Sequence, residues 1–136
     1  MDFLLYLTPI GREILTGVLM KNYQVQENAP ICKQNKTLFG YTKAPNFIIC
    51  TDNIKNTVSP VSHYVNETVY HEAVHVIHGC VSGPIKIRGA TLSTDKLTDV
   101  LRSSKITGSS VVYETEAYYL ESKPDQVNHY MKKYCF

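Results

Sequence analysis

The sequence has no long hydrophobic run. Near the start of the chain, five consecutive apolar residues, Phe3 to Leu7, follow Asp2. A membrane-spanning helix needs about 20 such residues, and a signal peptide needs a basic segment ahead of its apolar one. We therefore expect no membrane span and no secretion signal, and we assign the chain to the cytoplasm.

The sequence also lacks a concentration of positive charge. Fourteen Lys and Arg residues against twelve Asp and Glu residues give a formal net charge of +2. The only adjacent basic pair is Lys132 with Lys133. Because a nucleic-acid-binding domain carries basic side chains clustered on one face or along one helix, we expect no nucleic-acid partner.

Cysteine is sparse, and its spacing excludes a zinc ribbon. None of the four cysteines forms a C-x-x-C pair with another; they are Cys32, Cys50, Cys80 and Cys135. Because we expect no secretion signal, we also expect no disulfides. The four thiols are then expected to be reduced and buried, where they pack as small hydrophobic side chains.

What the chain does contain fits one folded domain. Of its 136 residues, 43% are hydrophobic and 19% are charged. A chain of this length can bury about two thirds of the surface that its unfolded form exposes. No segment is polar or repetitive enough to suggest disorder, so we expect a single domain over residues 1–136.

Periodicity and turn residues predict an α+β fold. Apolar residues at helical spacing indicate a first helix over Pro9–Lys21. Residues 37–42 and 46–51 are rich in β-branched and aromatic side chains, and Lys43-Ala44-Pro45 separates them. These two segments predict a small antiparallel sheet or hairpin.

Four further helices are expected after this sheet. Asn66 is a suitable N-cap for a helix that continues to about Cys80, and Gly83-Pro84 ends it. In the next helix we expect Leu97, Val100 and Leu101 to face inward. The last three helices are expected to begin at Ser93 or Thr94, at Ser109 or Ser110, and near Pro124.

The segment Tyr70–Gly79, YHEAVHVIHG, contains three of the five histidines. On an α-helix His71 and His75 project about 40° apart and about one turn apart in height, so both rings can reach one metal ion. Glu72 lies on the flank of this face. In the H-E-x-x-H pattern two histidines bind zinc and the glutamate is the general base. We therefore predict a Zn²⁺ site with ligands His71 and His75 and with Glu72 as base.

His78 lies on the same helix face but is not expected to be a ligand. It is about 10 Å along the helix axis from His71, and zinc ligands lie about 2 Å from the ion. In the longer H-E-x-x-H-x-x-G-x-x-H pattern His78 occupies the glycine position, and Val81 that of the third histidine. We expect His78 to support the site or to pack in the core, and we exclude the metzincin class.

The third ligand must come from another segment, and the predicted helix over residues 111–121 carries three glutamates. HEAVH followed by a helix that contains ETEA, residues 114–117, resembles the gluzincin class of zinc peptidases. The resemblance implies a zincin-like fold, in which a ligand glutamate on a second helix packs against the first, with a small residue three positions later. Glu114 with Ala117 fits this pattern.

Two alternatives to Glu114 remain on the same helix. Glu116 lies on the apolar side of the helix, but it would place the bulky Tyr119 at the position of close approach. Glu121 is about two turns beyond Glu114 and is expected to be solvated or to support the site. The resemblance therefore favours Glu114 as the third ligand, with Glu116 as the alternative.

The resemblance has limits in this sequence. It rests on residues 71–75 and 114–117, and in outline the chain is similar to short single-domain HExxH proteins of the kind that viral genomes encode. Tyr118 stands where many relatives have an Asp or Asn that orients a zinc histidine. The group that orients the histidines here is therefore not identified by the resemblance.

A zinc-dependent metallopeptidase that cleaves a peptide or protein substrate is the function that the resemblance implies. The strand over residues 46–51 could bind an extended substrate by strand addition. The alternatives are a non-catalytic zinc-binding interaction module and a metal hydrolase of a non-peptide amide. Glu72 argues against the module, because a structural metal site needs no base. Candidate donors to the oxyanion are Tyr70, Tyr113, Tyr118, Tyr119 and His78.

Overall fold

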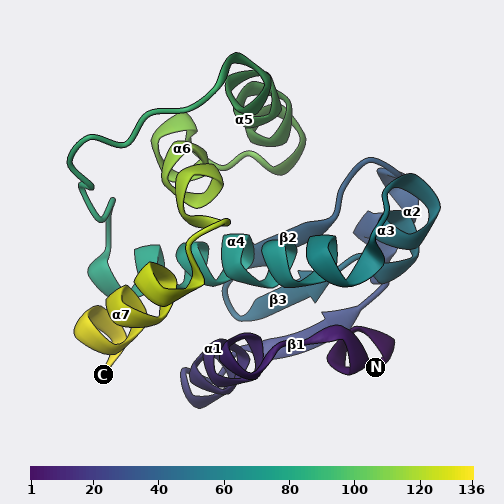
Figure 1. The fold of residues 1–136 in the computed structure, drawn as a ribbon, viewed down its shortest axis with the longest axis horizontal. Helices are drawn as coiled ribbons and strands as arrows, with labels where there is room; N and C mark the ends of the chain where they lie inside the picture. The colour runs from purple at the N-terminus through teal and green to yellow at the C-terminus, as the bar shows by residue number, and fades with distance from the viewer.

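The computed structural model describes residues 1–136 as an α+β fold, which confirms the predicted class. The fold contains seven α-helices, a short 3-10 helix and one three-stranded sheet, and α4 lies between the sheet and the helices α5 and α6 (Figure 1). None of the helices combines the length and the apolar character needed to cross a membrane. The elements are η1 Asp2–Tyr6, α1 Pro9–Met20, β1 Gln24–Glu27, α2 Pro30–Gln34, β2 Gly40–Lys43, β3 Asn46–Ile49, α3 Thr51–Thr57, α4 Val61–Val81, α5 Thr94–Thr107, α6 Val111–Leu120 and α7 Pro124–Cys135.

The sheet has the order β1-β3-β2 and mixes both strand directions. The predicted hairpin is confirmed as β2 and β3, which pair antiparallel with Gly40 opposite Ile49. The sequence prediction missed β1, which pairs parallel to β3 with Gln24 opposite Asn46. The expectation that residues 46–51 offer a free edge was wrong, because β3 is the central strand; the open edge near α4 belongs to β2.

Helix α4 begins six residues earlier than predicted, at Val61, with Pro60 as its N-cap. Asn66 is therefore not its N-cap but a buried residue inside the helix. The side-chain amide of Asn66 donates to the carbonyl groups of Tyr6 and Ser62, and its oxygen accepts from the backbone N–H of Thr8. The segment before α1 thus supplies hydrogen-bond partners for the Asn66 side chain. Capping rules consider only neighbours in sequence and therefore do not predict these bonds.

Helix α4 is the centre of the molecule (Figure 1). It packs against α1, α6 and α7 as well as the sheet. Its residues Val65, Val69, Ala73, Val76 and Ile77 are fully buried in the main hydrophobic core. One side of this helix therefore faces the core, and the opposite side faces the helices α5 and α6 (Figure 1).

Helix α5 is the least buried of the longer helices. Val100 is buried as expected, but Leu97 is 48% exposed and Leu101 is 63% exposed. The expectation that all three face inward was wrong, because α5 packs mainly against the single helix α6 and one neighbour covers only a narrow stripe.

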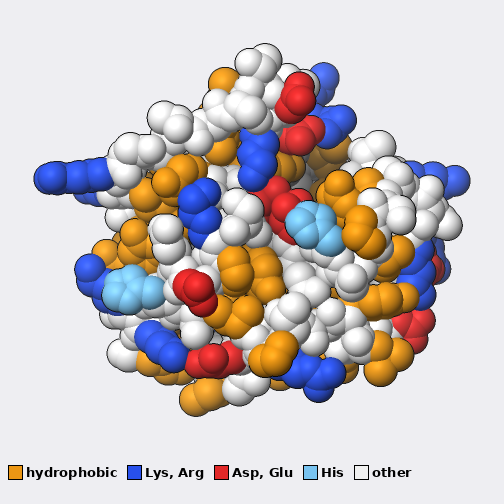
Figure 2. Space-filling model, viewed as in Figure 1, with side chains coloured by type: hydrophobic (Ala, Val, Ile, Leu, Met, Phe, Trp, Pro, Cys, Tyr) orange, Lys and Arg blue, Asp and Glu red, His pale blue; other side chains and the backbone are white.

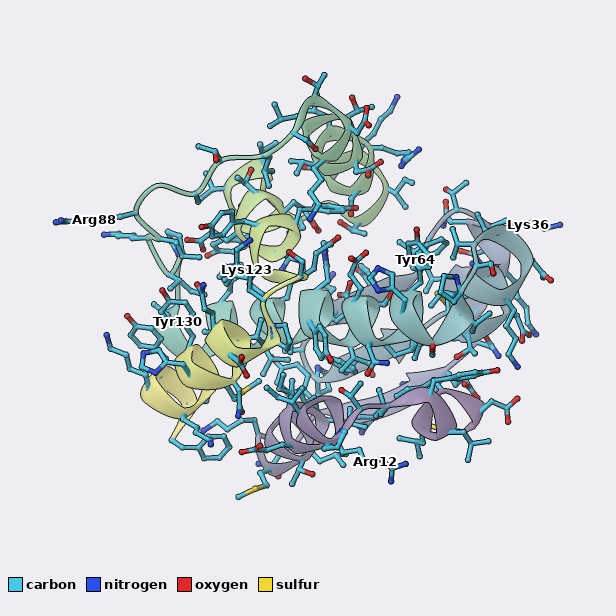
Figure 3. The ribbon with its side chains drawn as sticks, in the orientation of Figure 1. Arg12, Lys36, Tyr64, Arg88, Lys123 and Tyr130 are labelled. Atoms are coloured by element: carbon cyan, nitrogen blue, oxygen red, sulfur yellow. A yellow bond between two sulfur atoms is a disulfide. The ribbon has the colours of Figure 1, made fainter.

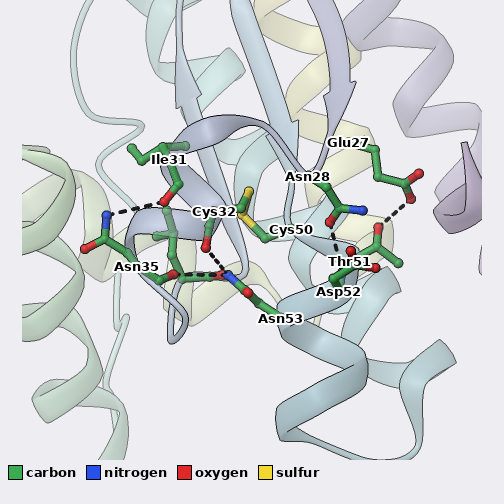
Figure 4. Close-up of a disulfide and its surroundings, with 10 residues drawn as sticks. Glu27, Asn28, Ile31, Cys32, Asn35, Cys50, Thr51, Asp52 and Asn53 are labelled. Carbon is green, nitrogen blue, oxygen red and sulfur yellow. Dashed lines mark hydrogen bonds between the residues drawn. A yellow bond between two sulfur atoms is a disulfide. The ribbon is translucent and has the colours of Figure 1, made fainter.

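Both pairs of cysteines form disulfides, which corrects the expectation of reduced thiols. Cys32 in α2 is bonded to Cys50 at the end of β3 (Figure 4), and Cys80 near the end of α4 is bonded to Cys135 in α7. Sequence spacing could not reveal these pairs, because the partners are 18 and 55 residues apart and are brought together only by the fold.

Candidate metal centre

The two histidines of HEAVH and one glutamate of α6 converge between α4 and α6. The ligand atoms of His71, His75 and Glu114 all lie within 4.8 Å of one another. The Nε2 atom of His71 is 3.0 Å from one carboxylate oxygen of Glu114, and the Nε2 atom of His75 is 3.2 Å from the other. The structure thus brings together the three residues that the sequence prediction names as ligands.

The donor atoms of these three residues are of the kinds that bind zinc. Two imidazole nitrogens and one carboxylate oxygen are a common set of protein ligands for zinc, and such a set leaves the fourth position of a tetrahedral ion open to water. Tetrahedral ligands that are each about 2 Å from an ion lie about 3.3 Å from one another. The observed contacts to Glu114 are close to this spacing.

Burial and hydrogen bonding act in opposite directions on the pKa values of Glu114 and His71. Burial alone would raise the pKa of Glu114, but hydrogen bonds with His71 and His75 outweigh it and hold the pKa far below its ordinary value. Burial would lower the pKa of His71, and its bonds to Glu114 and Glu121 instead raise it well above normal. A buried carboxylate here is balanced by positive charge, which a dication can supply in place of protons.

Glu72 lies beside the three candidate ligands without joining them. Its carboxylate is 3.9 Å from Nε2 of His71 and accepts a hydrogen bond of 2.7 Å from the hydroxyl of Thr42 in β2. Burial raises the pKa of Glu72. A raised pKa brings a carboxylate closer to the range in which a general base both accepts and returns a proton.

Glu121 supplies the support for His71 that the resemblance left unidentified. Its carboxylate is 2.8 Å from Nδ1 of His71, and Tyr118 touches the same ring edge-on with ring centres 4.4 Å apart. A carboxylate on the second ring nitrogen fixes the tautomer and orientation of a ligand histidine. The sequence signal was weak, because Glu121 follows Glu114 by seven residues, whereas the resemblance to gluzincins implies an orienting group four residues after the ligand glutamate.

Glu116, the alternative ligand, points away from the histidine pair and holds a loop. Its carboxylate is 2.8 Å from Nε2 of His78. It also accepts backbone N–H bonds from Ile85, Lys86 and Ile87 in the loop after α4. His78 is therefore a buried hydrogen-bond partner of Glu116. Burial lowers the pKa of His78 to about 4.

Two neighbouring cavities lie at the candidate metal centre, and both are lined by Gly40 and Glu72. Together they are called the cleft. The first, of about 360 Å³, is lined by His71, Glu72 and Tyr118 together with residues of β2 and α5. The second, of about 630 Å³, is lined by His75, Glu72 and Glu114. Figure 2 shows acidic side chains recessed between the α5–α6 region and α4, with an exposed histidine beside them. Tyr64 projects from α4 toward the same side (Figure 3) and lines the first cavity.

The candidate oxyanion donors are separated by their positions. Tyr113 lines the second cavity and stacks on His78, and Tyr118 lines the first. The hydroxyl of Tyr70 instead bonds to Thr8 on the side of α1, and the ring of Tyr119 lies under the ammonium group of Lys123. Of the five candidates, Tyr113, Tyr118 and His78 thus line the cavities beside the candidate metal centre.

The chain belongs to the family described as a domain of unknown function (DUF8637), whose model matches residues 3–136. No curated protein and no solved structure matches the chain.

Proposed function

We propose that this protein is a zinc-dependent metallopeptidase with a zincin-like fold. One observation carries the proposal: His71, His75 and Glu114 present converging ligand atoms, with Glu72 beside them at the floor of a cleft. A purely structural zinc site closes its fourth position with a protein ligand and needs no base. The three ligands and the adjacent carboxylate instead support a hydrolytic centre.

Each residue has a defined role in this proposal. A zinc ion held by His71, His75 and Glu114 would acidify a water molecule and polarise a carbonyl group. Glu72 accepts the proton of the attacking water and returns it to the leaving amine. The hydroxyl of Thr42 orients the Glu72 carboxylate, and Glu121 orients His71.

The open edge of β2 supports a peptide as the substrate. The Cys50 N–H donates to the Phe39 carbonyl at 2.7 Å, which makes these two residues a hydrogen-bonded pair. The alternation of an antiparallel ladder then directs the backbone groups of Gly40 and Thr42 away from β3. An extended polypeptide can pair with these groups beside Glu72. A small non-peptide amide lacks the repeated backbone N–H and C=O groups that such pairing requires.

The proposed compartment is an oxidising one and not the cytoplasm. All four cysteines are paired in disulfides, and such bonds persist where thiols are not kept reduced. The substrate is then an extended or unfolded segment of a protein that the enzyme meets in that compartment.

The Glu72→Gln variant tests the proposal against its alternatives. We expect it to retain one zinc per chain but to cleave a reduced, unfolded protein at least about 100-fold more slowly than the wild type, since general-base catalysis contributes that much. Zinc content is measured by mass spectrometry of the metal, and cleavage by the appearance of new peptides. Glu13→Gln, at an exposed residue paired with Lys132, is the control and should behave as the wild type. Zinc binding without cleavage by the wild type would instead support the interaction module.

A further inference from the structure

Helix α5 is attached to the rest of the molecule by few contacts. It packs chiefly on α6 and buries only Val100. The loop before it contains Gly89, and α5 ends at Gly108; both glycines have a positive φ and no atom within 4 Å of where a Cβ would lie. Figure 1 shows α5 standing off from α4 at the end of this loop, and Arg88 extends from the loop away from the protein (Figure 3). A helix with so few buried contacts is a local unit of low stability.

The same helix forms the outer wall of the cleft. Asp99, Arg102, Ser103 and Ile106 lie on one helical face and line the first cavity opposite His71 and Glu72. Thr107 and Gly108, at the end of α5, line the second cavity. Displacement of α5 would therefore open both cavities at once.

One charged side chain connects α5 to the groups that touch His71. The ammonium group of Lys96 donates to the backbone carbonyl of Tyr118 at 3.0 Å and lies 3.6 Å from the carboxylate of Glu121. Tyr118 and Glu121 both contact the His71 ring.

We propose that α5 is a lid over the metal centre and that Lys96 is the latch that holds it closed. Because Lys96 bonds to Tyr118 and Glu121, closure of the lid also holds the groups that orient His71. Opening admits an extended substrate to the edge of β2, and closure excludes water from the cleft. The part of this inference that concerns substrate rests on the proposed function, whereas the movement of α5 does not.

Hydrogen exchange on the purified protein without substrate tests the lid. In the wild type we expect the amides of α5 to exchange faster than those in the core of α4. In Lys96→Met, which keeps the length of the side chain and removes its charge, exchange in α5 should become about tenfold faster while exchange in α4 stays unchanged. Lys96→Arg should restore most of the protection, because a guanidinium can donate to the same groups.

Lys105→Met is the matched control, since Lys105 is an exposed lysine in the last turn of the same helix; it should exchange as the wild type does. Equal protection of α5 and α4 in the wild type would overturn the lid. An unchanged α5 in Lys96→Met, or an equal acceleration of α4, would overturn the latch. Because no substrate is present, these outcomes are independent of whether the protein cleaves peptides.

In the cleavage assay, loss of the latch should affect KM without affecting the zinc content. Lys96→Met should change KM several-fold, because it alters how often the cleft is open, while zinc content stays at one per chain. Lys105→Met should change neither. A loss of zinc from Lys96→Met would show that Lys96 supports the metal site itself and would overturn its role as a latch.

Discussion

At the scale of single residues, Gly40 allows β2 to lie directly against α4. A Cβ atom at this position would be 2.8 Å from the Cγ atom of Glu72 and 2.8 Å from the Cγ2 atom of Thr68. The absence of a side chain therefore permits the close approach in which Thr42 bonds to Glu72 at 2.7 Å. Gly40 thus contributes to the site through the space that it leaves open.

Gly40→Ala should disturb this contact. We expect a loss of stability of about 1–3 kcal/mol, the usual range for an added methyl group in a well-packed region, together with slower substrate cleavage because Glu72 is displaced. Chemical denaturation measures the stability. Gly83→Ala, at a site with no atom within 4 Å, is the control and should change stability by less than about 0.5 kcal/mol. Equal stability of the two variants would contradict the close approach.

Glu67 is a second residue with an unusual environment. Burial, followed by the nearby charge of Glu121, raises its pKa to about 8. In the unfolded chain the same group titrates near its ordinary value of 4.5. The native state therefore keeps a proton that the unfolded state loses, and the stabilisation present below pH 4.5 declines as the pH rises toward 8.

Glu67→Gln should remove this pH dependence. At pH 9 we expect the variant to be more stable than the wild type by about 1–2 kcal/mol, a value reduced because solvent reaches part of the side chain. At pH 4, where the carboxyl group is protonated in both states, the two proteins should be nearly equal. Unfolding curves at a series of pH values measure the difference, and a gap that does not grow between pH 5 and 8 would contradict the assigned pKa.

At the scale of elements, α6 carries two glutamates with different roles, one at the candidate metal site and one that holds the loop after α4. Glu114 points to the histidine pair on α4, whereas Glu116 accepts the N–H groups of the loop over residues 85–87 and bonds to His78. One helix therefore completes the candidate metal site and fixes the chain that leaves α4.

Alanine variants of the two glutamates should distinguish the effect on zinc binding from the effect on stability. Glu114→Ala should lose stoichiometric zinc, because it removes the only carboxylate that contacts both histidines. Glu116→Ala should keep its zinc but lose about 2–4 kcal/mol of stability, because several buried donors lose their acceptor. Metal analysis after dialysis and thermal unfolding measure the two effects. Zinc loss from Glu116→Ala with retention in Glu114→Ala would reverse the assignment.

At the scale of the whole molecule, two disulfides connect segments that are distant in sequence. The Cys80–Cys135 bond joins the end of α4 to α7 across 55 residues, and the Cys32–Cys50 bond spans 18. A cross-link restricts the unfolded chain more strongly when it closes a longer loop. The first bond is therefore expected to contribute more to global stability.

Removal of each disulfide by paired serine substitution tests this order. Loop closure predicts a loss of about 4 kcal/mol for Cys80→Ser with Cys135→Ser and about 3 kcal/mol for Cys32→Ser with Cys50→Ser. Denaturant unfolding under non-reducing conditions measures both. Addition of a reductant should destabilise the wild type more than either variant, and an insensitive wild type would show that these bonds do not form in solution.

Several features were predictable because they depend on neighbours in sequence. The first helix, the hairpin and the helix over Pro124–Cys135 follow from periodicity and turn residues. The missed features depend on distant partners. Asn66 is satisfied by the segment before α1, and β1 is a strand because it pairs with β3.

The sequence by itself determined the α+β class and the convergence of His71 and His75 on one helix face, because helix geometry relates residues four apart. Only the tertiary structure decided that Glu114 and not Glu116 meets this pair, that β2 and not β3 has the free edge, and that the cysteines are paired. Each of these depends on contacts between segments far apart in the chain, whose geometry is determined by how α4 packs against its neighbours.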